Sequence, residues 1–421
     1  MDLPQLPVFE TELLRPQTLL SSLAILHALA AQLAVGGGIL AALFEVRGER
    51  WGEPLLREFV HRALAPLILI AAVLALVSGV GAWLATSLVA PRASLLLGRE
   101  FIWLLGAAGC SVAFGVVCGA AYLSRARTAP ARRRWLLLGG FILGTGLALL
   151  GVEGVLAFRL SPEEWVRTGD AWDGVLGAAL APSLARRVLS SLALAAVAGL
   201  IGVERMQGLD ESDRRLLART ILVVLVPLAL MPMATIGLLG VVTEADGPAP
   251  SPWALPLGLA ALGSLLVAGG ALALLVRGRS RPGRSIVVGL AALVVGSAVI
   301  AERARETLAL PYDIRGVLYA NGLTPEEVDL RRAARPRPRE GVAREEIQRG
   351  RQVHRELCAR CHASRGRSSI QELTRSWDRE MLIGNLAKLH RLQPSMPPFA
   401  GSDPELEELV AWLLWTRDGG R

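Results

Sequence analysis

The sequence carries little charge for its length. Asp, Glu, Lys and Arg make up 19% of its 421 residues, whereas hydrophobic residues make up 52%. A soluble enzyme of this size carries more charge, so the composition predicts an all-α protein that crosses a membrane several times. The formal net charge of +8 is almost all arginine. Arginines that flank membrane helices account for this charge, and no nucleic-acid partner is expected.

Cysteine and histidine are also scarce, with four and five residues respectively. Four cysteines are too few for a disulfide framework. Residues 1–16 are acidic and mixed, without a cleavable signal pattern, so we expect the first apolar run to be a membrane helix. Two of the cysteines and one histidine stand together in the stretch CARCH at residues 358–362.

Eight apolar runs are long enough for a helix that crosses the hydrocarbon core, which takes about 20 residues. They occupy residues 17–44, 63–88, 101–123, 135–158, 186–203, 219–243, 253–276 and 285–301. Every second loop, beginning with the first, is rich in arginine, and the others are acidic or nearly neutral. Because Lys and Arg mark the cytoplasmic side, we expect a multi-pass protein of the bacterial cytoplasmic membrane with both termini on the outer (periplasmic) side.

The apolar character ends near residue 310. We therefore expect a membrane domain over residues 1–310, an external linker over 311–345 and a small soluble helical domain over 346–421. Residues 324–345 are rich in Pro, Arg and Glu, which is typical of a partly extended tether.

The stretch Cys-x-x-Cys-His is the attachment motif of a c-type haem. Thiols separated by two residues on a helical turn, here Cys358 and Cys361, can both reach the haem vinyl groups, and the adjacent His362 can ligate the iron. The alternatives are a redox-active cysteine pair and half of a zinc site. No further Cys/His ligands follow at the spacing that zinc requires.

A second iron ligand is predicted further along. Met396 lies in the proline-rich stretch SMPPFAG, 34 residues after His362. A thioether from such a loop can take the sixth coordination position, and His/Met ligation raises the haem potential. The stretch DPELEELVAWLLW at 403–415 then predicts a capped amphipathic helix.

Together these features resemble a small class I cytochrome c domain over about residues 346–417. Gly350 is expected to open the helix that leads into the motif, and His354 stands where the family often has an aromatic residue, whose packing it could imitate. Haem c is attached outside the cytoplasm, which agrees with the side that the loop charges indicate.

Ionisable residues within membrane helices are candidates for function. His27 lies about 16 Å along the first predicted helix, near mid-membrane. Glu100, at the start of the third helix, Glu153, late in the fourth, and Glu302, at the end of the eighth, fall in the outer half. His61 is expected at the inner interface. For His27 an iron ligand and a hydrogen-bonded structural histidine are both open.

Four stretches resemble subunit I of cytochrome bd-type quinol oxidases, in family order through about residues 15–320. They are LLSSLAILHALAAQLAVGGGILAALFEVRGERWGEPLLREF, LLLGREFIWLL, GVEGVLAF and AERARETLALPYDIRGVLY. The resemblance implies that His27 ligates a haem iron, that Glu100 and Glu302 serve the same site, and that Arg305 matches a motif arginine. It also implies one or two non-covalent b- or d-type haems and a second membrane subunit.

The sequence also departs from that family. Leu189 and Gly258 stand where the ligands of the low-spin haem b are expected, and Ala108 replaces a second carboxylate. Residues 244–253 replace a long quinol-binding loop, and Glu153 falls at a usual Asn. Direct quinol oxidation by the family mechanism is therefore not expected.

Three functions stay open. The first is a membrane-bound protein that passes electrons between haem c and membrane haem, with other respiratory electron carriers as partners. If its membrane haem is catalytic, it reduces oxygen or another small oxidant. The second is a non-catalytic, membrane-anchored cytochrome c that shuttles electrons between respiratory complexes. A transporter with a redox sensor has little support, because no inverted repeat or broken helix is visible.

Overall fold

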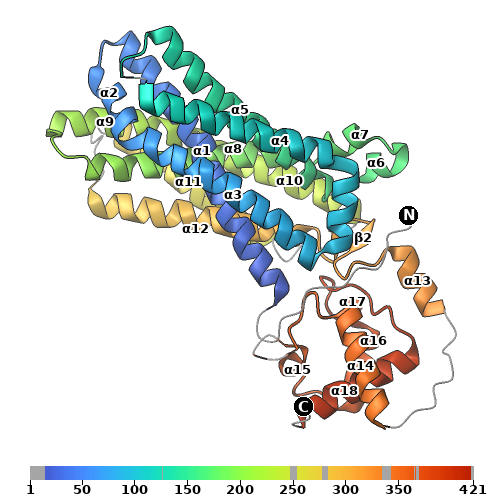
Figure 1. The fold of residues 1–421 in the computed structure, drawn as a ribbon. Helices are drawn as coiled ribbons and strands as arrows, with labels where there is room; N and C mark the ends of the chain where they lie inside the picture. Colours follow the sequence, from blue (N-terminus) through green and yellow to red (C-terminus); the bar gives the residue numbers. More distant parts are fainter. Residues whose placement is uncertain are drawn as a thin grey trace. The chain divides into compact units, whose positions relative to one another are not determined.

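The computed structural model describes residues 15–125, 127–246, 254–276, 283–333, 343–364, 366 and 369–418. Within these residues, eight helical spans are long and apolar enough to cross a membrane. Six are single helices: α1 (Pro16–Arg50), α4 (Pro91–Arg125), α5 (Ala131–Phe158), α8 (Leu180–Arg205), α11 (Ala254–Val276) and α12 (Arg284–Leu308). This confirms the predicted all-α multi-pass fold (Figure 1).

The other two spans change helix type along their length. One consists of α2 (Pro54–Phe59), the π-helical η1 (Val60–Leu64) and α3 (Ala65–Val89). The other consists of α9 (Glu211–Leu225), the 3₁₀ segment η2 (Val226–Leu230) and α10 (Met231–Asp246). Pro227 lies in η2, and its missing N–H removes a helical hydrogen bond, which accounts for the tighter turn there.

The helices extend beyond the apolar runs that predicted them. α4 begins at Pro91, so Glu100 lies in its third turn and not at its start, and α12 continues to Leu308 beyond Glu302. His61 lies within η1, inside a continuous helix and not at its start. Arg and Glu are good helix formers, so polar turns continue a helix that hydropathy alone ends too early.

The chain divides into two compact units. The bundle unit is Ala24–Val80 with Phe101–Leu308, and the C-terminal unit comprises the described residues among 1–23, 81–100 and 309–421. In the bundle unit, Gly36 of α1 passes so close to α8 that an added Cβ would lie 1.9 Å from the Ser191 carbonyl oxygen. Small residues permit such close helix packing in membranes.

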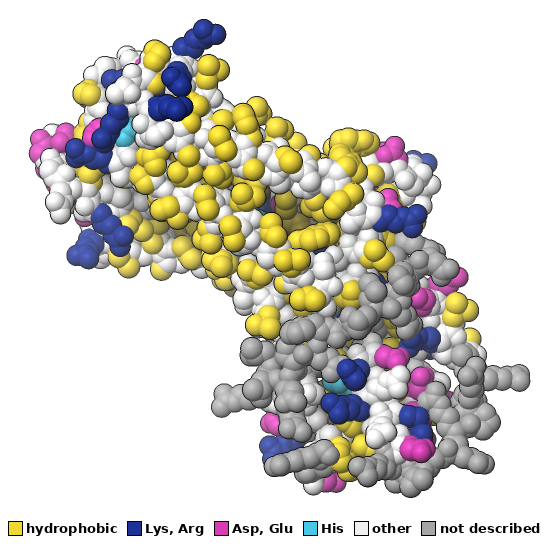
Figure 2. Space-filling model, viewed as in Figure 1, with side chains coloured by type: hydrophobic (Ala, Val, Ile, Leu, Met, Phe, Trp, Pro, Cys, Tyr) yellow, Lys and Arg dark blue, Asp and Glu magenta, His cyan; other side chains and the backbone are white. Residues whose placement is uncertain are grey.

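Arginine-bearing loops gather at one end of the bundle unit, where Figure 1 labels α2 and α9, and apolar side chains cover the helices beyond them (Figure 2). Arg134 contacts Glu49 at 2.5 Å and Glu45 at 3.6 Å, and Arg127 contacts Glu58 at 3.4 Å. The first and third loops therefore lie together, as the alternation of their charges predicts.

In the C-terminal unit, an antiparallel pair of short strands, β1 (Tyr312–Ile314) and β2 (Leu318–Tyr319), is followed by α13 (Pro325–Ala333). The predicted extended tether is therefore wrong for this part of 324–345. Thr324 caps α13, because its Oγ1 accepts from the Glu327 N–H at 3.2 Å while its own N–H donates to Glu327. Pro325 occupies the first helical position, where proline is favoured, and residues 334–342 lie outside the described part.

The remaining helices are α14 (Ala343–Leu357), α15 (Ile370–Leu373), α16 (Arg379–Ala387), α17 (Leu389–Leu392) and α18 (Asp403–Arg417) (Figure 1). α14 and α18 cross at Gly350, where an added Cβ would lie 1.9 Å from the Glu408 carbonyl oxygen. Gly350 thus lies in the middle of α14 and does not open it. His354 packs against Trp412 with ring centroids 4.7 Å apart, so it does replace an aromatic residue.

Candidate functional site

The CARCH stretch continues α14 as a helical turn. The N–H groups of His362 and Cys361 donate to the Cys358 carbonyl oxygen at 2.9 and 3.1 Å. Both thiols are free, and Cys358 packs against the apolar core of the domain. The two cysteines and the histidine are therefore displayed on one turn, as attachment to a haem edge requires.

The electrostatics of this turn fit a haem better than a redox pair or a zinc site. Burial raises the pKa of Cys358 to about 12, with a contribution from Cys361, whereas reactive cysteine pairs have lowered pKa values. Burial and the nearby Arg15 lower the pKa of His362 to about 4, so its imidazole is neutral at pH 7, as a metal ligand must be.

Two further observations bear on the choice between a haem, a redox-active cysteine pair and a zinc site. In the described part of the chain, the buried Nδ1 of His362 has no hydrogen-bond partner. The same residues hold no group of three or more His, Cys, Asp or Glu side chains that suits a bare metal ion. Cys358, Cys361 and His362 thus fit covalent haem c.

Met396 lies in the loop between α17 and α18 and is half-buried. Its N–H donates to the Gln393 carbonyl at 2.9 Å, and its own carbonyl oxygen lies 2.9 Å from Nδ1 of His390. The contact from His390 holds the loop that carries the predicted sulfur ligand. Sequence reasoning missed His390, because a lone histidine six residues before a methionine has no recognisable pattern.

Residues 309–333, here called the collar, hold the CARCH turn and the methionine loop. Arg360, between the two cysteines, forms an ion pair with Asp313 of β1. Arg332 of α13 donates to the Phe399 carbonyl oxygen at 2.9 Å. Leu323 and Val328 of the collar form a small buried cluster with Ala400. The collar therefore contacts both segments that carry the predicted iron ligands.

The collar is joined in turn to the first turn of α4. Arg92 donates to both carboxylate oxygens of Glu327, at 2.7 and 2.8 Å, and to the Gly322 carbonyl at 2.5 Å. Burial alone would raise the pKa of Glu327, but the hydrogen bonds from Arg92 and from the Thr324 N–H outweigh it and lower the pKa. Arg92 is buried and the Glu327 side chain is partly exposed, so the ion pair is shielded on the arginine side only.

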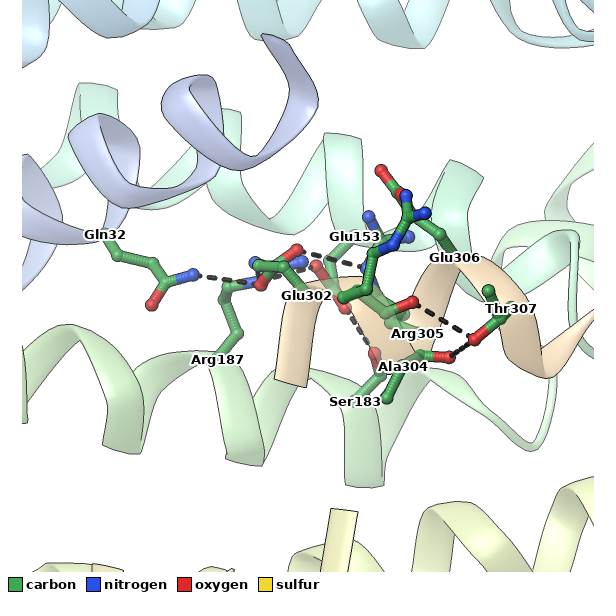
Figure 3. Close-up of polar contacts among 10 residues, drawn as sticks. Gln32, Glu153, Ser183, Arg187, Glu302, Ala304, Arg305, Glu306 and Thr307 are labelled. Carbon is green, nitrogen blue, oxygen red and sulfur yellow. Dashed lines mark hydrogen bonds and ion pairs between the residues drawn. The ribbon is translucent and has the colours of Figure 1, made fainter. Parts of the chain in front are cut away.

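A buried ion network lies in the bundle unit (Figure 3). Glu302 accepts from Gln32 of α1 at 3.1 Å, from Arg305 at 3.3 Å and from Arg187 of α8. Arg187 also donates to Glu153 of α5 at 3.1 Å. The network links four membrane helices through groups that are all shielded from solvent. In the sequence, this network is indicated by two adjacent arginines within an apolar run, Arg186 and Arg187.

The structure brings Glu302, Arg305 and Glu153 together, but it gives Glu302 arginine partners. Two cavities beside the network measure about 20 and 10 Å³, which suits one or two waters and not a porphyrin. Leu189 is buried in the apolar core and Gly258 is exposed, so neither position presents a ligand to a haem.

His27 is half-buried on α1, with its ring over Gly79. Its Nδ1 lies 3.0 Å from the Ala75 carbonyl oxygen and 3.3 Å from Ser78 Oγ. When Nδ1 donates to Ala75, Nε2 keeps its lone pair, which is the usual arrangement in a metal-ligating histidine. Glu100 belongs to the C-terminal unit, half-buried and 3.8 Å from Arg99. The haem roles of His27, Glu100 and Glu302 stay predictions.

Comparisons with known proteins support the two parts separately. The family model described as "Cytochrome C oxidase, cbb3-type, subunit III" matches residues 345–413. The structure of bd oxidase from Geobacillus thermodenitrificans is similar with a TM-score of 0.60 and 16% identity, over 72% of this chain and 88% of that chain. No curated protein sequence matches the chain.

These findings confirm both resemblances, the second at the level of the fold. The chain joins a C-terminal cytochrome c domain to a multi-pass membrane bundle with the fold of a bd oxidase. A protein with these two parts is a membrane haem protein that transfers electrons.

Proposed function

We propose that the protein passes electrons within one molecule between haem c in the C-terminal domain and a redox centre in the membrane bundle, as a cytochrome c-linked reductase of oxygen or another small oxidant. When bound, haem c supplies one-electron iron chemistry. The observation that carries the proposal is the collar, which contacts the CARCH turn through Arg360 and the methionine loop through Phe399.

The collar favours a fixed domain over a mobile one. A tethered shuttle depends on the range that its linker allows. Here Arg360 pairs with Asp313 of the collar, and Glu327 of the collar pairs with Arg92 of α4. All four side chains belong to the C-terminal unit, so the haem c domain is held against residues 81–100 of the same unit.

Each site residue has a defined task in this proposal. Cys358 and Cys361 would form the thioether links to haem c, and His362 and Met396 would ligate its iron. His27 offers Nε2 to the iron of one b- or d-type haem, because Ala75 fixes its Nδ1. The domain faces the periplasm, as the arginine-rich loops indicate. Partners are membrane lipid, a second membrane subunit and other respiratory electron carriers.

A second function is favoured by the ion network. Glu302 is already engaged by Arg187 and Arg305, and the neighbouring cavities are water-sized. In this alternative the bundle holds no haem, and the protein is a non-catalytic, membrane-anchored cytochrome c that serves other complexes.

Haem analysis of the purified protein distinguishes the two. Pyridine haemochrome spectra quantify covalent and extractable haem in the wild type, in a Cys358→Ser/Cys361→Ser variant and in His27→Ala. We expect the cysteine variant to lose only covalent haem and His27→Ala to lose only extractable haem. His61→Ala, a change of a buried histidine in η1, should lose neither. Wild-type protein without extractable haem would contradict the proposal and establish the anchored cytochrome.

A further inference from the structure

We infer that the bundle unit binds a small monovalent anion of the size of chloride beside Arg186 of α8. This site adjoins Glu302, but the inference does not rest on the presence of a membrane haem. It is carried by the charge of the buried network and by the position of Arg186 between two cavities.

The side chains that line the smaller of the two cavities include one more cation than anions. The carboxylates are Glu153 and Glu302, and the guanidinium groups are Arg186, Arg187 and Arg305. Arg187 pairs with both carboxylates and Arg305 pairs with Glu302. Among the residues that the structure describes, no carboxylate forms an ion pair with Arg186.

Arg186 is nevertheless buried, with 7% of its surface exposed, and its Nε has no hydrogen-bond partner within the described part. Arginine cannot lose its charge by deprotonation at physiological pH. A buried charge without a direct partner is costly, and the nearest carboxylates, Glu153 and Glu302, are already engaged by Arg187 and Arg305, so a bound anion would stabilise the site. Water would satisfy the N–H groups but would leave the charge uncompensated.

The cavity next to Arg186 has the size and lining for such an ion. It measures about 20 Å³, which limits the occupant to an atom-sized or very small ion. Its polar lining is one guanidinium group and four hydroxyl side chains: Arg186, Ser190, Thr235, Ser264 and Ser297. Ser264 Oγ already donates to the Ala260 carbonyl oxygen at 3.0 Å, so the guanidinium group and the other hydroxyls are the donors left for an anion, and no acidic residue lines this cavity.

Chloride binding to the purified full-length protein tests the inference. The protein is prepared in sodium gluconate, and thermal unfolding is followed by circular dichroism while chloride replaces gluconate at constant ionic strength. A ligand that binds only the folded state raises the unfolding temperature in a saturable manner. We expect this rise in the wild type and in Arg219→Gln, which removes an exposed arginine of α9.

We expect Arg186→Met to lose the chloride-dependent rise, while its stability in gluconate equals or exceeds that of the wild type. Thr235→Val keeps the cation and the fold, and should weaken chloride affinity several-fold; it serves as the test if Arg186→Met does not fold. Bromide, followed by titration calorimetry, should bind at the same site. Equal unfolding temperatures in chloride and gluconate, or an unchanged response in Thr235→Val and Arg186→Met, would overturn the inference and leave a site for water only.

Discussion

Arg360, the third residue of the CARCH motif, forms an ion pair with Asp313 of β1. The residue between the two cysteines therefore ties the haem attachment turn to the collar, and Arg92 ties the collar to α4. A side chain that the motif leaves free to vary thus determines how the cytochrome c domain is held.

Removal of that ion pair should loosen the domain. Arg360→Ala leaves Asp313 without its buried partner, so we expect the C-terminal unit to lose roughly 1–3 kcal/mol of stability. Electron transfer out of haem c should slow several-fold, because the domain no longer keeps one position. Denaturant unfolding monitored by haem c absorbance and flash-induced kinetics measure the two effects. Arg379→Ala, which removes an exposed arginine of α16, should change neither; equal rates in Arg360→Ala and wild type would show that the ion pair has no positioning role.

Gly350→Ala should destabilise the cytochrome c domain. An added Cβ would lie 1.9 Å from the Glu408 carbonyl oxygen, so α14 and α18 must move apart. Overpacking of this kind costs about 1–3 kcal/mol, and occasionally more. The measurement is denaturant unfolding followed by haem c absorbance, with haem content as a check on folding. Gly384→Ala is the matched control in α16, where nothing lies within 4 Å of the new Cβ; a loss of stability as large in Gly384→Ala would contradict the packing explanation.

Met396→His should lower the midpoint potential of haem c. His/Met ligation gives a higher potential than coordination without the thioether, because sulfur favours the reduced iron. A redox titration of the purified protein measures the change. Met381→His, on the exposed face of α16, should leave the potential unchanged. If Met396→His retains the wild-type potential, Met396 is not the sixth ligand.

The Arg92–Glu327 ion pair should make the C-terminal unit sensitive to acid. Hydrogen bonds from Arg92 and Thr324 hold the pKa of Glu327 below its usual value. The stabilisation is complete above the unfolded pKa of about 4.3 and is lost as the pH falls through the lower folded pKa. Unfolding free energy measured from pH 7 down to pH 3 should fall less steeply in Glu327→Gln. Glu326→Gln, which changes an exposed neighbour, should retain the wild-type dependence of stability on pH. If Glu327→Gln also retains it, the Arg92–Glu327 pair is not the cause of the acid sensitivity.

The parts of the fold that follow from hydrophobic length were predictable, and the parts that follow from packing were not. Eight apolar runs gave eight spans, because the hydrocarbon core admits little else. The CARCH turn followed from its spacing, and His354 was correctly expected to pack as an aromatic residue. Residues 324–345 were predicted as a partly extended tether, because proline composition does not reveal that Pro325 begins a capped helix.

The candidate site also has a part that the sequence predicts and a part that depends on packing. Hydropathy marks Glu302 as unusual in an apolar helix, but it cannot show which partners other helices bring to it. Gln32 and Arg187 reach Glu302 from α1 and α8. Those contacts depend on how the helices pack, and helix packing cannot be predicted from a single sequence. His390 was missed for the same reason, since its contact with Met396 exists only through the fold of the loop.

Intramolecular electron transfer tests the central proposal most directly. Haem c in the purified, oxidised protein is reduced by a photoinduced electron donor, and its reoxidation is followed together with the spectrum of the membrane redox centre. We predict that haem c loses its electron to that centre at a rate independent of protein concentration, as transfer within one molecule requires. Reoxidation that rises with protein concentration, or that occurs only when an external acceptor is added, would contradict the proposal and identify a membrane-anchored carrier.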